Sequence, residues 1–245
     1  MKISILTMCP EMFGDYLRTH AVTRAAGLGL AEVEIIDIRD FAGGSYRHID
    51  DSPFGGGRGL ILRCQPVLDA LKSVRTQGCR TAALVPVGRP YQQADAHRLA
   101  REDHLILICG HYEGMDARIY DHVDELISIG DYILTGGELA AMVVTDSVIR
   151  LRKGNLKAGS AEEESFENGL LEYPQYTQPA DFRGQTVPPV LLSGHHEKIR
   201  RWRLKESLRL TLRQRPDLLE GRRLSPEESG LLEEIRTEDG AEAGK

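Results

Sequence analysis

The chain has 245 residues, 41% hydrophobic and 28% charged, a composition that predicts a globular protein with a core sufficient for one large domain or two modest ones. Its longest apolar runs, such as residues 105–109, fall far short of the roughly 18 to 20 residues that a membrane span needs, which excludes a membrane-spanning protein. A formal net charge of −6 argues against a general polyanion binder, although the charge is unevenly placed along the chain.

The N-terminus and the cysteines indicate a cytoplasmic protein. The first residues lack the long apolar region and small-residue cleavage site of a secretory signal, and are typical of a buried first strand. Cys9, Cys64, Cys79 and Cys109 show neither the spacing of a zinc site nor that of a disulfide framework, so we expect reduced thiols and no metal site. Cys109 is interpreted as a small core hydrophobe at the end of a strand.

Apolar periodicity predicts the elements of the first domain. Runs bounded by turn residues predict β-strands at residues 3–8, 33–38, 81–87, 105–109 and 125–129. Helical spacing predicts helices at residues 12–26, 66–74, 93–101 and 138–151. Strands alternating with helices predict an α/β domain over residues 1–153, with a parallel sheet flanked by helices.

The composition changes after Gly154. Residues 154–172 are rich in Gly, Ser and Glu and predict a flexible interdomain linker, and residues 173–245 predict a small, mainly α-helical domain. One helix is expected to begin after Ser193 and to end at Pro216. Another is expected to begin at Ser225, because Glu228 three residues later completes the pattern of a capping box.

The second domain has a strongly uneven charge. Residues 198–215 hold eight Lys/Arg against one Glu, a net charge of +7, whereas residues 216–245 hold nine acids against four bases, a net charge of −5. A basic helix that also carries Trp202 indicates contact with RNA or another acidic partner. The alternative is a solvated helix face.

Glycines follow three consecutive predicted strands, namely Gly88, Gly110 and Gly130, with Gly136 and Gly137 a few residues further on. Each alone is typical of a tight turn. Together, at the carboxyl ends of parallel strands, they predict one pocket in which bare peptide groups bind a flat heterocycle. No G-x-G-x-x-G opens a helix after the first strand, and "GGGRG" at 55–59 lacks the Lys of a phosphate loop, which disfavours nucleotide hydrolysis and dinucleotide redox chemistry.

Six blocks carry a more specific resemblance: "PEMF" (10–13), "DDSPFGGGRG" (50–59), "CGHYEGMD" (109–116), "SIGDYILTGGEL" (128–139), "EEESFENGLLEYPQYTQP" (162–179) and "LLSGHHEKIRRWR" (191–203). In this order, over nearly the whole chain to about residue 216, they resemble the bacterial tRNA (guanine-N1)-methyltransferases of the SPOUT class. The resemblance implies S-adenosylmethionine as methyl donor and N1 of the guanosine at position 37, 3′-adjacent to the anticodon, as acceptor. It also implies a homodimer with an active site shared between subunits, and a deep trefoil knot, which periodicity alone does not predict.

The resemblance implies a cofactor pocket made of Leu84, Pro86, Gly88, Gly110, Tyr112, Glu113, Ile129, Gly130, Tyr132, Leu134, Gly136 and Gly137. Aliphatic side chains in this set suit an adenine ring, and the Glu113 carboxylate suits hydroxyl hydrogen bonds. For Tyr112 and Tyr132 the alternative is core packing with a hydroxyl handle.

Methyl transfer to guanine N1 needs a base for the N1 proton and a cation near O6, where negative charge develops. The resemblance implies Glu164 as the base and Arg150 as the cation. The family usually has Asp at the position of the base, so the longer Glu164 is a departure, and Glu162 and Glu163 are competing carboxylates. A solvated acidic linker is the alternative.

RNA contacts are implied for Asp50, Gly55, Gly56, Gly57, Arg58, Lys198, Arg200, Arg201 and Arg203. Asp50 is a candidate for reading the target guanine, within a segment that also carries Arg47, although a flexible surface loop is the alternative there. Trp202 suits a core anchor as well as RNA contact. Two further departures from the family are Gln178 in place of Arg and Ala140 in place of Pro.

Two other functions stay open at the level of sequence. Another SPOUT activity, such as 2′-O-methylation, has little need of a base such as Glu164. A non-catalytic RNA-binding protein would use the basic helix alone. The sequence also leaves a requirement for Mg²⁺ open.

Overall fold

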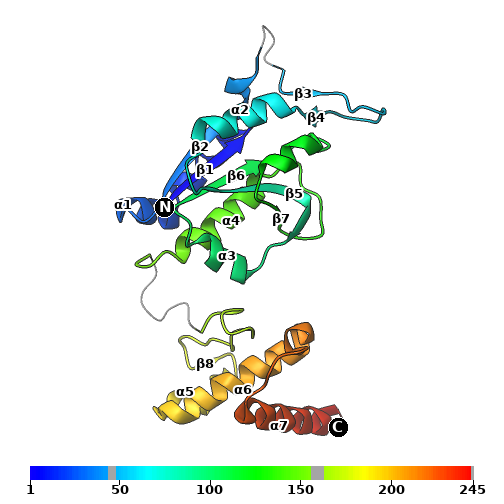
Figure 1. Ribbon diagram of the computed structural model, residues 1–245. Coiled ribbons are helices and arrows are strands. Elements are labelled where there is room, and N and C mark those ends of the chain that lie inside the picture. The colour runs from blue at the N-terminus through cyan, green and yellow to red at the C-terminus, as the bar shows by residue number, and fades with distance from the viewer. Residues whose placement is uncertain (44–47, 156–162, 244–245) are drawn as a thin grey trace. The chain divides into compact units, whose positions relative to one another are not determined.

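The computed structural model describes residues 1–43, 48–155 and 163–243, and the chain divides into two compact units, Met1–Lys157 and Ala158–Lys245 (Figure 1). Each unit is described by itself. Among the described residues, every helix is too short or too polar to span a lipid bilayer.

The first unit is built on a five-stranded parallel sheet with the order β2-β1-β6-β5-β7. Its strands are β1 (Lys2–Thr7), β2 (Glu32–Asp37), β5 (Arg80–Pro90), β6 (His104–Cys109) and β7 (Glu125–Ser128). In the central register Ile5 lies beside Ile35 on one side and Leu107 on the other. All five predicted strands are confirmed, and β5 is longer than predicted because its pairing with β7 resumes at Arg89 after a register shift.

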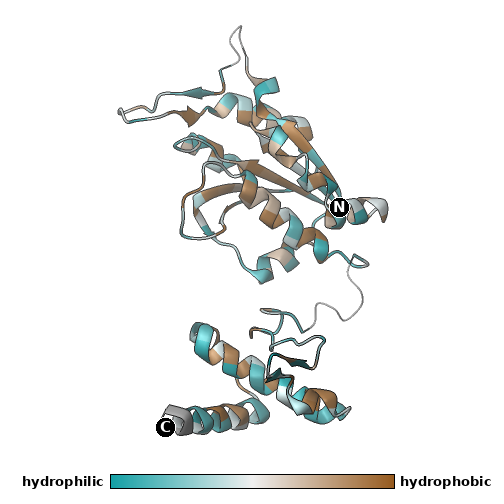
Figure 2. Ribbon diagram, turned by 180° about the vertical axis from the view of Figure 1, so that it is seen from behind, coloured by the Kyte–Doolittle hydropathy of each residue, from teal (hydrophilic) through white to brown (hydrophobic). Residues whose placement is uncertain are grey.

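Helices cover both faces of this sheet. One face packs against α1 (His20–Gly27), α3 (Gln93–Leu99) and α4 (Glu138–Arg150), and the other against α2 (Cys64–Val74) and the 3₁₀ helix η4 (Ala117–His122). Alternate residues of β6 pack on opposite faces of the sheet. Leu105 and Leu107 belong to the core on the first face, and Ile106 and Ile108 to the core on the second. Figure 2 shows the strands as the most apolar part of the unit. The predicted parallel sheet flanked by helices is therefore confirmed.

The helix predicted over residues 12–26 is wrong as a single element. The segment forms two 3₁₀ turns, η1 (Pro10–Phe13) and η2 (Tyr16–Arg18), before α1 begins. Thr19 adopts an extended conformation, with φ −60° and ψ 151°, and so separates η2 from α1. The apolar spacing arises because Phe13, Val22 and Ala25 all pack into one core, although from different turns.

The second unit is mainly helical, as predicted. It contains α5 (Pro189–Leu192), α6 (His196–Gln214), the 3₁₀ helix η5 (Pro216–Leu219), α7 (Pro226–Ala243) and a short hairpin of β8 (Asp181–Phe182) and β9 (Gln185–Thr186). Its core is formed by Leu170, Leu208, Leu231, Leu232 and Ile235. Trp202 is half-buried and lies outside this core cluster.

The capping box predicted for the last helix is confirmed. The Glu228 N–H donates to Ser225 Oγ at 3.1 Å, and the Ser225 N–H donates to a Glu228 carboxylate oxygen at 2.7 Å. Arg222 adds an ion pair to Glu228 at 2.9 Å. The start of α7 is therefore fixed by local side chains.

Part of the segment predicted as a flexible linker is built into the second unit. Residues 156–162 lie outside the described residues, but residues 163–172 form hydrogen-bonded turns, such as Glu167 N–H to the Glu164 carbonyl at 3.2 Å. Leu170, only 1% exposed, packs into the core of the unit. The short stretch that carries Glu164 is thereby anchored at one end.

Candidate active site

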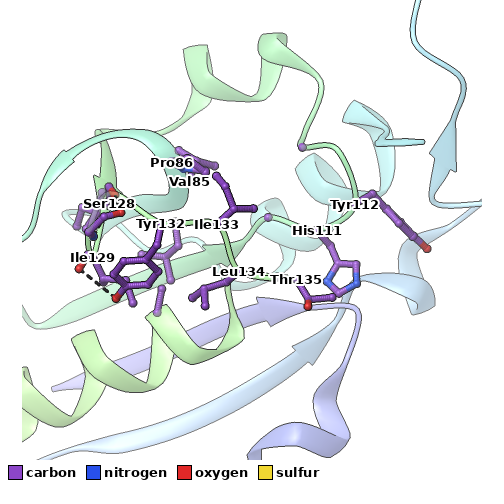
Figure 3. A pocket seen from close by; sticks show the side chains of 18 of the residues that line it. Val85, Pro86, His111, Tyr112, Ser128, Ile129, Tyr132, Ile133, Leu134 and Thr135 are labelled. Atoms are coloured by element: carbon purple, nitrogen blue, oxygen red, sulfur yellow. Dashed lines mark hydrogen bonds between the residues drawn. The ribbon is translucent and has the colours of Figure 1, made fainter. Parts of the chain in front are cut away.

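A cavity of about 320 Å³ lies beside the middle of β5 and at the carboxyl ends of β6 and β7 (Figure 3). It is formed by residues 84–86 of β5, by the end of β7, by the loops after β6 and β7, and by the first turn of α4. Eleven of the twelve residues predicted for the cofactor pocket line it: Leu84, Pro86, Gly110, Tyr112, Glu113, Ile129, Gly130, Tyr132, Leu134, Gly136 and Gly137. The glycine-bearing loops after β6 and β7 thus meet at one place, beside β5.

Gly88 is the exception. It does not line the cavity, and a Cβ at Gly88 would collide with the backbone of Ile127 and Leu126 in the neighbouring strand β7. The glycine is required there because β5 and β7 pass too closely for any side chain. Gly88 therefore allows the close pairing of β5 and β7.

The cavity wall depends on an equally close passage of the chain at Gly137. The Gly137 N–H donates to the Gly110 carbonyl at 2.7 Å, and a Cβ on Gly137 would lie 2.8 Å from Cys109 Cα. Cys109 is buried in the core, as predicted, which fixes the end of β6 against which this segment rests. The loop after β6 and the segment before α4 are therefore held in direct backbone contact at the cavity wall.

The lining is largely aliphatic, with polar groups from the backbone. Leu84, Ile129 and Leu134 supply apolar walls, and the Tyr132 hydroxyl donates to the Ile129 carbonyl at 3.4 Å, the dashed line in Figure 3. A slot with apolar walls suits a flat heterocycle.

Sequence reasoning missed eight lining residues: Val85, His111, Gly114, Ile127, Ser128, Ile133, Thr135 and Ala140. Most are neighbours in sequence of predicted residues, so the signal available was position within the same three loops. His111 was the most informative omission, because its side chain is mostly buried and its ring packs edge-on against Tyr112 with ring centroids 5.0 Å apart.

Tyr112 joins the cavity to a second hollow. That hollow, of about 530 Å³, is lined by Tyr112 together with Asp50, His48 and Arg39 among others. Burial first, and then the nearby Asp50 carboxylate, raises the pKa of Tyr112 to about 12. Tyr112 has φ 57°, an uncommon backbone conformation for a residue with a side chain. Asp50, the predicted guanine-reading residue, therefore lies beside a residue of the predicted cofactor pocket.

The predicted substrate loop is a hairpin of β3 (Asp50–Asp51) and β4 (Ile61–Leu62) with an exposed tip. The tip contains Gly55, Gly56, Gly57 and Arg58, while Arg47 lies outside the described residues. The base of the hairpin is tied to the cavity loop, because the Glu113 N–H donates to the Leu60 carbonyl at 3.1 Å.

The two predicted catalytic residues belong to different units. Arg150 lies in the last turn of α4 in the first unit, and the half-buried Glu164 lies in the second. Glu163 is engaged by its own unit, since its carboxylate accepts from the Tyr173 hydroxyl at 2.6 Å and from Arg203 at 3.2 Å. Glu162 lies outside the described residues.

The basic face predicted to bind RNA is partly covered by acids of α7. Arg200 pairs with Glu227 at 2.6 Å, Arg201 with Glu234, and Arg209 with Glu238 at 2.7 Å. Lys205 pairs with both Glu234 and Glu238, at 3.0 and 2.7 Å. The predicted net charge of α6 is therefore not all available to a ligand.

Residues at the start of α6 differ in how they are held. Lys198 is exposed and makes no ion pair among the described residues, whereas Arg203 lies over the Tyr173 ring, with its guanidinium carbon 4.8 Å from the ring centroid. The predicted RNA contacts of these residues stay a prediction.

The chain is similar to known proteins over nearly its whole length. Residues 1–221 match the family model described as tRNA (Guanine-1)-methyltransferase TrmD. A tRNA (guanine-N(1)-)-methyltransferase of Streptococcus uberis is 52% identical over 239 residues, which cover 97% of this chain and 100% of the relative. One of Streptococcus pyogenes serotype M4 is 52% identical over 237 residues, covering 96% and 98%.

Proposed function

The chain belongs to the tRNA (guanine-1)-methyltransferase family and is an enzyme of that class, and from this premise we propose that it transfers a methyl group from S-adenosylmethionine to N1 of guanosine 37 in tRNA. The family has the SPOUT fold with a trefoil knot. Bound S-adenosylmethionine supplies an electrophilic methyl group on a sulfonium centre.

The observation that carries the proposal is the cavity where the loops after β6 and β7 meet beside β5. Its aliphatic walls, including Leu84, Ile129 and Leu134, fit the two faces of an adenine ring. A Cβ at Gly110 would lie 3.2 Å from the Leu84 carbonyl, so a side chain there would crowd the slot between the loops. These residues would hold S-adenosylmethionine, with Glu113 near its hydroxyl groups.

We assign the proton and charge transfers to Glu164 and Arg150. Guanine N1 becomes a good nucleophile when its proton leaves, so the Glu164 carboxylate would accept that proton. Charge then spreads to O6, where the Arg150 guanidinium would stabilise it by hydrogen bonding. Both assignments rest on the family resemblance, with Glu164 inside the block at 162–179 and Arg150 at the end of α4.

The target guanine is proposed to enter beside Tyr112, in the hollow that Asp50 lines. The exposed tip of the β3–β4 hairpin and the first turns of α6 would contact the tRNA backbone, with Lys198 as the most available cation. Ile133, Leu139 and Val143 are 80%, 48% and 48% exposed, an apolar surface on and beside α4 that supports burial against a second copy. We therefore propose a homodimer with a shared active site.

The test is mass analysis of nucleosides from unmodified tRNA incubated with the protein and S-adenosylmethionine. The proposal expects 1-methylguanosine, and none when position 37 of the tRNA is changed from guanosine to adenosine. Appearance of a 2′-O-methylated nucleoside instead would favour the other SPOUT activity. Calorimetry with S-adenosylmethionine alone separates both from a purely RNA-binding protein, which predicts no heat of binding.

A further inference from the structure

Three side chains that are far apart in the sequence meet beside the cavity. Cys9 follows β1, His111 follows β6, and Glu138 begins α4, and one donor atom from each lies within 4.8 Å of the others. They supply a thiol, an imidazole and a carboxylate. Sequence reasoning did not detect this group, because 102 positions separate Cys9 from His111 and 27 separate His111 from Glu138.

The carboxylate and the imidazole are incompletely satisfied. Glu138 is only 1% exposed, and its Oε1 accepts from the Thr7 hydroxyl at 2.7 Å. Its Oε2 faces His111 Nδ1 at 3.8 Å, too far for a hydrogen bond. His111 Nδ1 is itself buried without a hydrogen-bond partner among the described residues. A positive centre here, either a proton on the ring or a bound cation, would satisfy both groups.

Space for such a centre is kept open by Gly136. A Cβ at Gly136 would collide with both Glu138 Oε2 and His111 Nδ1, so any other residue would fill the gap between the two donor atoms. Gly136 pairs with His111 through an isolated antiparallel bridge, which holds the backbone beside the gap.

We propose that Cys9, His111 and Glu138 bind a Zn²⁺ ion, with water as the fourth ligand. Zinc bonds of about 2.0–2.3 Å in a tetrahedral site separate the ligand atoms by about 3.3–3.8 Å. His111 Nδ1 and Glu138 Oε2, 3.8 Å apart, would close by about 0.5 Å to reach the separation of a nitrogen–oxygen pair on tetrahedral zinc. The pairs that include the Cys9 sulfur, all within 4.8 Å, would close by about 1.3 Å or less. On coordination the Cys9 thiol releases its proton to solvent.

The donor set selects among cations. Thiolate and imidazole suit Zn²⁺ or Co²⁺, whereas Mg²⁺ requires oxygen ligands in octahedral geometry. The site is therefore distinct from any Mg²⁺ that the reaction uses. The Thr7 hydroxyl, which holds Oε1, orients the carboxylate as an outer partner of the ion.

The ion would tie the end of β1 to two segments that line the cavity. These are the loop that carries His111 and Tyr112 and the first turn of α4. Zinc binding would then stabilise the folded first unit by mass action and fix the wall of the cavity that His111 lines.

Cobalt spectroscopy of the full chain, freed of metal by a chelator, tests the proposal. Titration with Co²⁺ should give one equivalent of a tetrahedral visible spectrum with a sulfur-to-cobalt charge-transfer band, which Zn²⁺ then bleaches. In the zinc-loaded protein, X-ray absorption should find one sulfur at about 2.3 Å and nitrogen or oxygen at about 2.0–2.2 Å. Absence of a sulfur shell, or only octahedral cobalt, overturns the proposal.

Matched cysteine variants locate the sulfur. Cys9→Ser should abolish the charge-transfer band and weaken zinc binding by more than about 100-fold, the upper end of the loss seen for outer partners of metal ligands. Cys79→Ser, a half-buried cysteine outside the cluster, should keep both. A band that survives Cys9→Ser overturns the proposal. Metal binding is measured without tRNA or S-adenosylmethionine, so its failure is separate from failure of the proposed methyl transfer.

Discussion

At the scale of single residues, the proposed base Glu164 is the side chain on which methyl transfer should depend most. Glu164→Gln keeps the size of the side chain but cannot accept the N1 proton, so the rate of guanosine methylation should fall by about 10²–10⁴-fold. Single-turnover assays with saturating tRNA measure the rate, and calorimetry should show unchanged binding of S-adenosylmethionine. Glu164→Asp, which restores a carboxylate, should recover much of the loss.

The neighbouring Glu163 provides the matched control. Its carboxylate is already held by Tyr173 and Arg203, so Glu163→Gln should change the rate by less than about 10-fold. If the large loss appears in Glu163→Gln and not in Glu164→Gln, the base has been assigned to the wrong carboxylate.

Gly88 gives a prediction about packing. In Gly88→Ala the new methyl group would meet the Ile127 and Leu126 backbone, so the free energy of unfolding should fall by about 1–3 kcal/mol. Gly27→Ala has no atom within 4 Å of the new Cβ and should be neutral or stabilising by up to about 1 kcal/mol. Urea unfolding followed by far-ultraviolet circular dichroism compares them. If the two variants are equally stable, β5 and β7 can move apart at Gly88 without a loss of stability.

At the scale of elements, the pairing of α6 with α7 should limit the affinity for tRNA. Glu234 pairs with both Arg201 and Lys205, so Glu234→Gln should tighten tRNA binding by about 2–5-fold, the range of an exposed ion pair. The slope of log Kd against log salt should also steepen. Glu233→Gln removes the same charge from α7 at an exposed position, and should change binding less. Equal effects would mean that only net charge matters.

The same helix pair should respond to acid. Hydrogen bonds first from Arg209 and then from Lys205 lower the pKa of Glu238 to about 2, below its ordinary 4.5. A lowered carboxyl pKa contributes stability that is present above about pH 4.5 and is lost as the pH falls towards 2. Fluorescence of Trp202, the single tryptophan, reports unfolding of this unit alone. In Glu238→Gln the stability of the unit should fall less between pH 4.5 and 2 than in the wild type. An unchanged dependence of stability on pH would exclude the contacts of Glu238 with Arg209 and Lys205 as the source of the loss.

The elements differ in how far the sequence could predict them. The strands of the sheet are apolar runs buried on both faces, so local pattern was sufficient. The break at Thr19 was not predictable, because apolar spacing does not distinguish one helix from successive turns that face the same core. The pairing of α6 with α7 joins residues about 30 positions apart, which a count of charges along the chain does not reveal.

The candidate site was likewise predictable from the sequence only in part. The glycines after β6 and β7 were enough to predict that their loops meet, because the carboxyl ends of parallel strands share one edge. Gly88 lies within β5 and outside the cavity, since a glycine required by a neighbouring strand looks the same in sequence as one required by a ligand. The knot was implied only by resemblance, because threading leaves no local pattern.

At the scale of the whole molecule, the proposed sharing of the active site can be tested with mixed dimers. If Arg150 and Glu164 act on one guanine from different subunits, a heterodimer of Arg150→Ala and Glu164→Gln chains has one intact site and one doubly altered site. Isolated by two different tags, it should have about half the activity of the wild-type dimer. If both residues come from one subunit, the heterodimer should be as inactive as its parents.

The position of β6 between β1 and β5 has a consequence for how the protein is made. The ribosome releases β1 and β2 early, but the central strand that joins them to the rest of the sheet is complete only at residue 109. At about 5–20 residues per second, the nascent chain carries an open apolar edge at β1 for roughly 5–20 s. During this interval the exposed edge of β1 can pair with strands of other chains. We therefore expect chaperone binding during translation to affect the yield of folded protein more than refolding after release does.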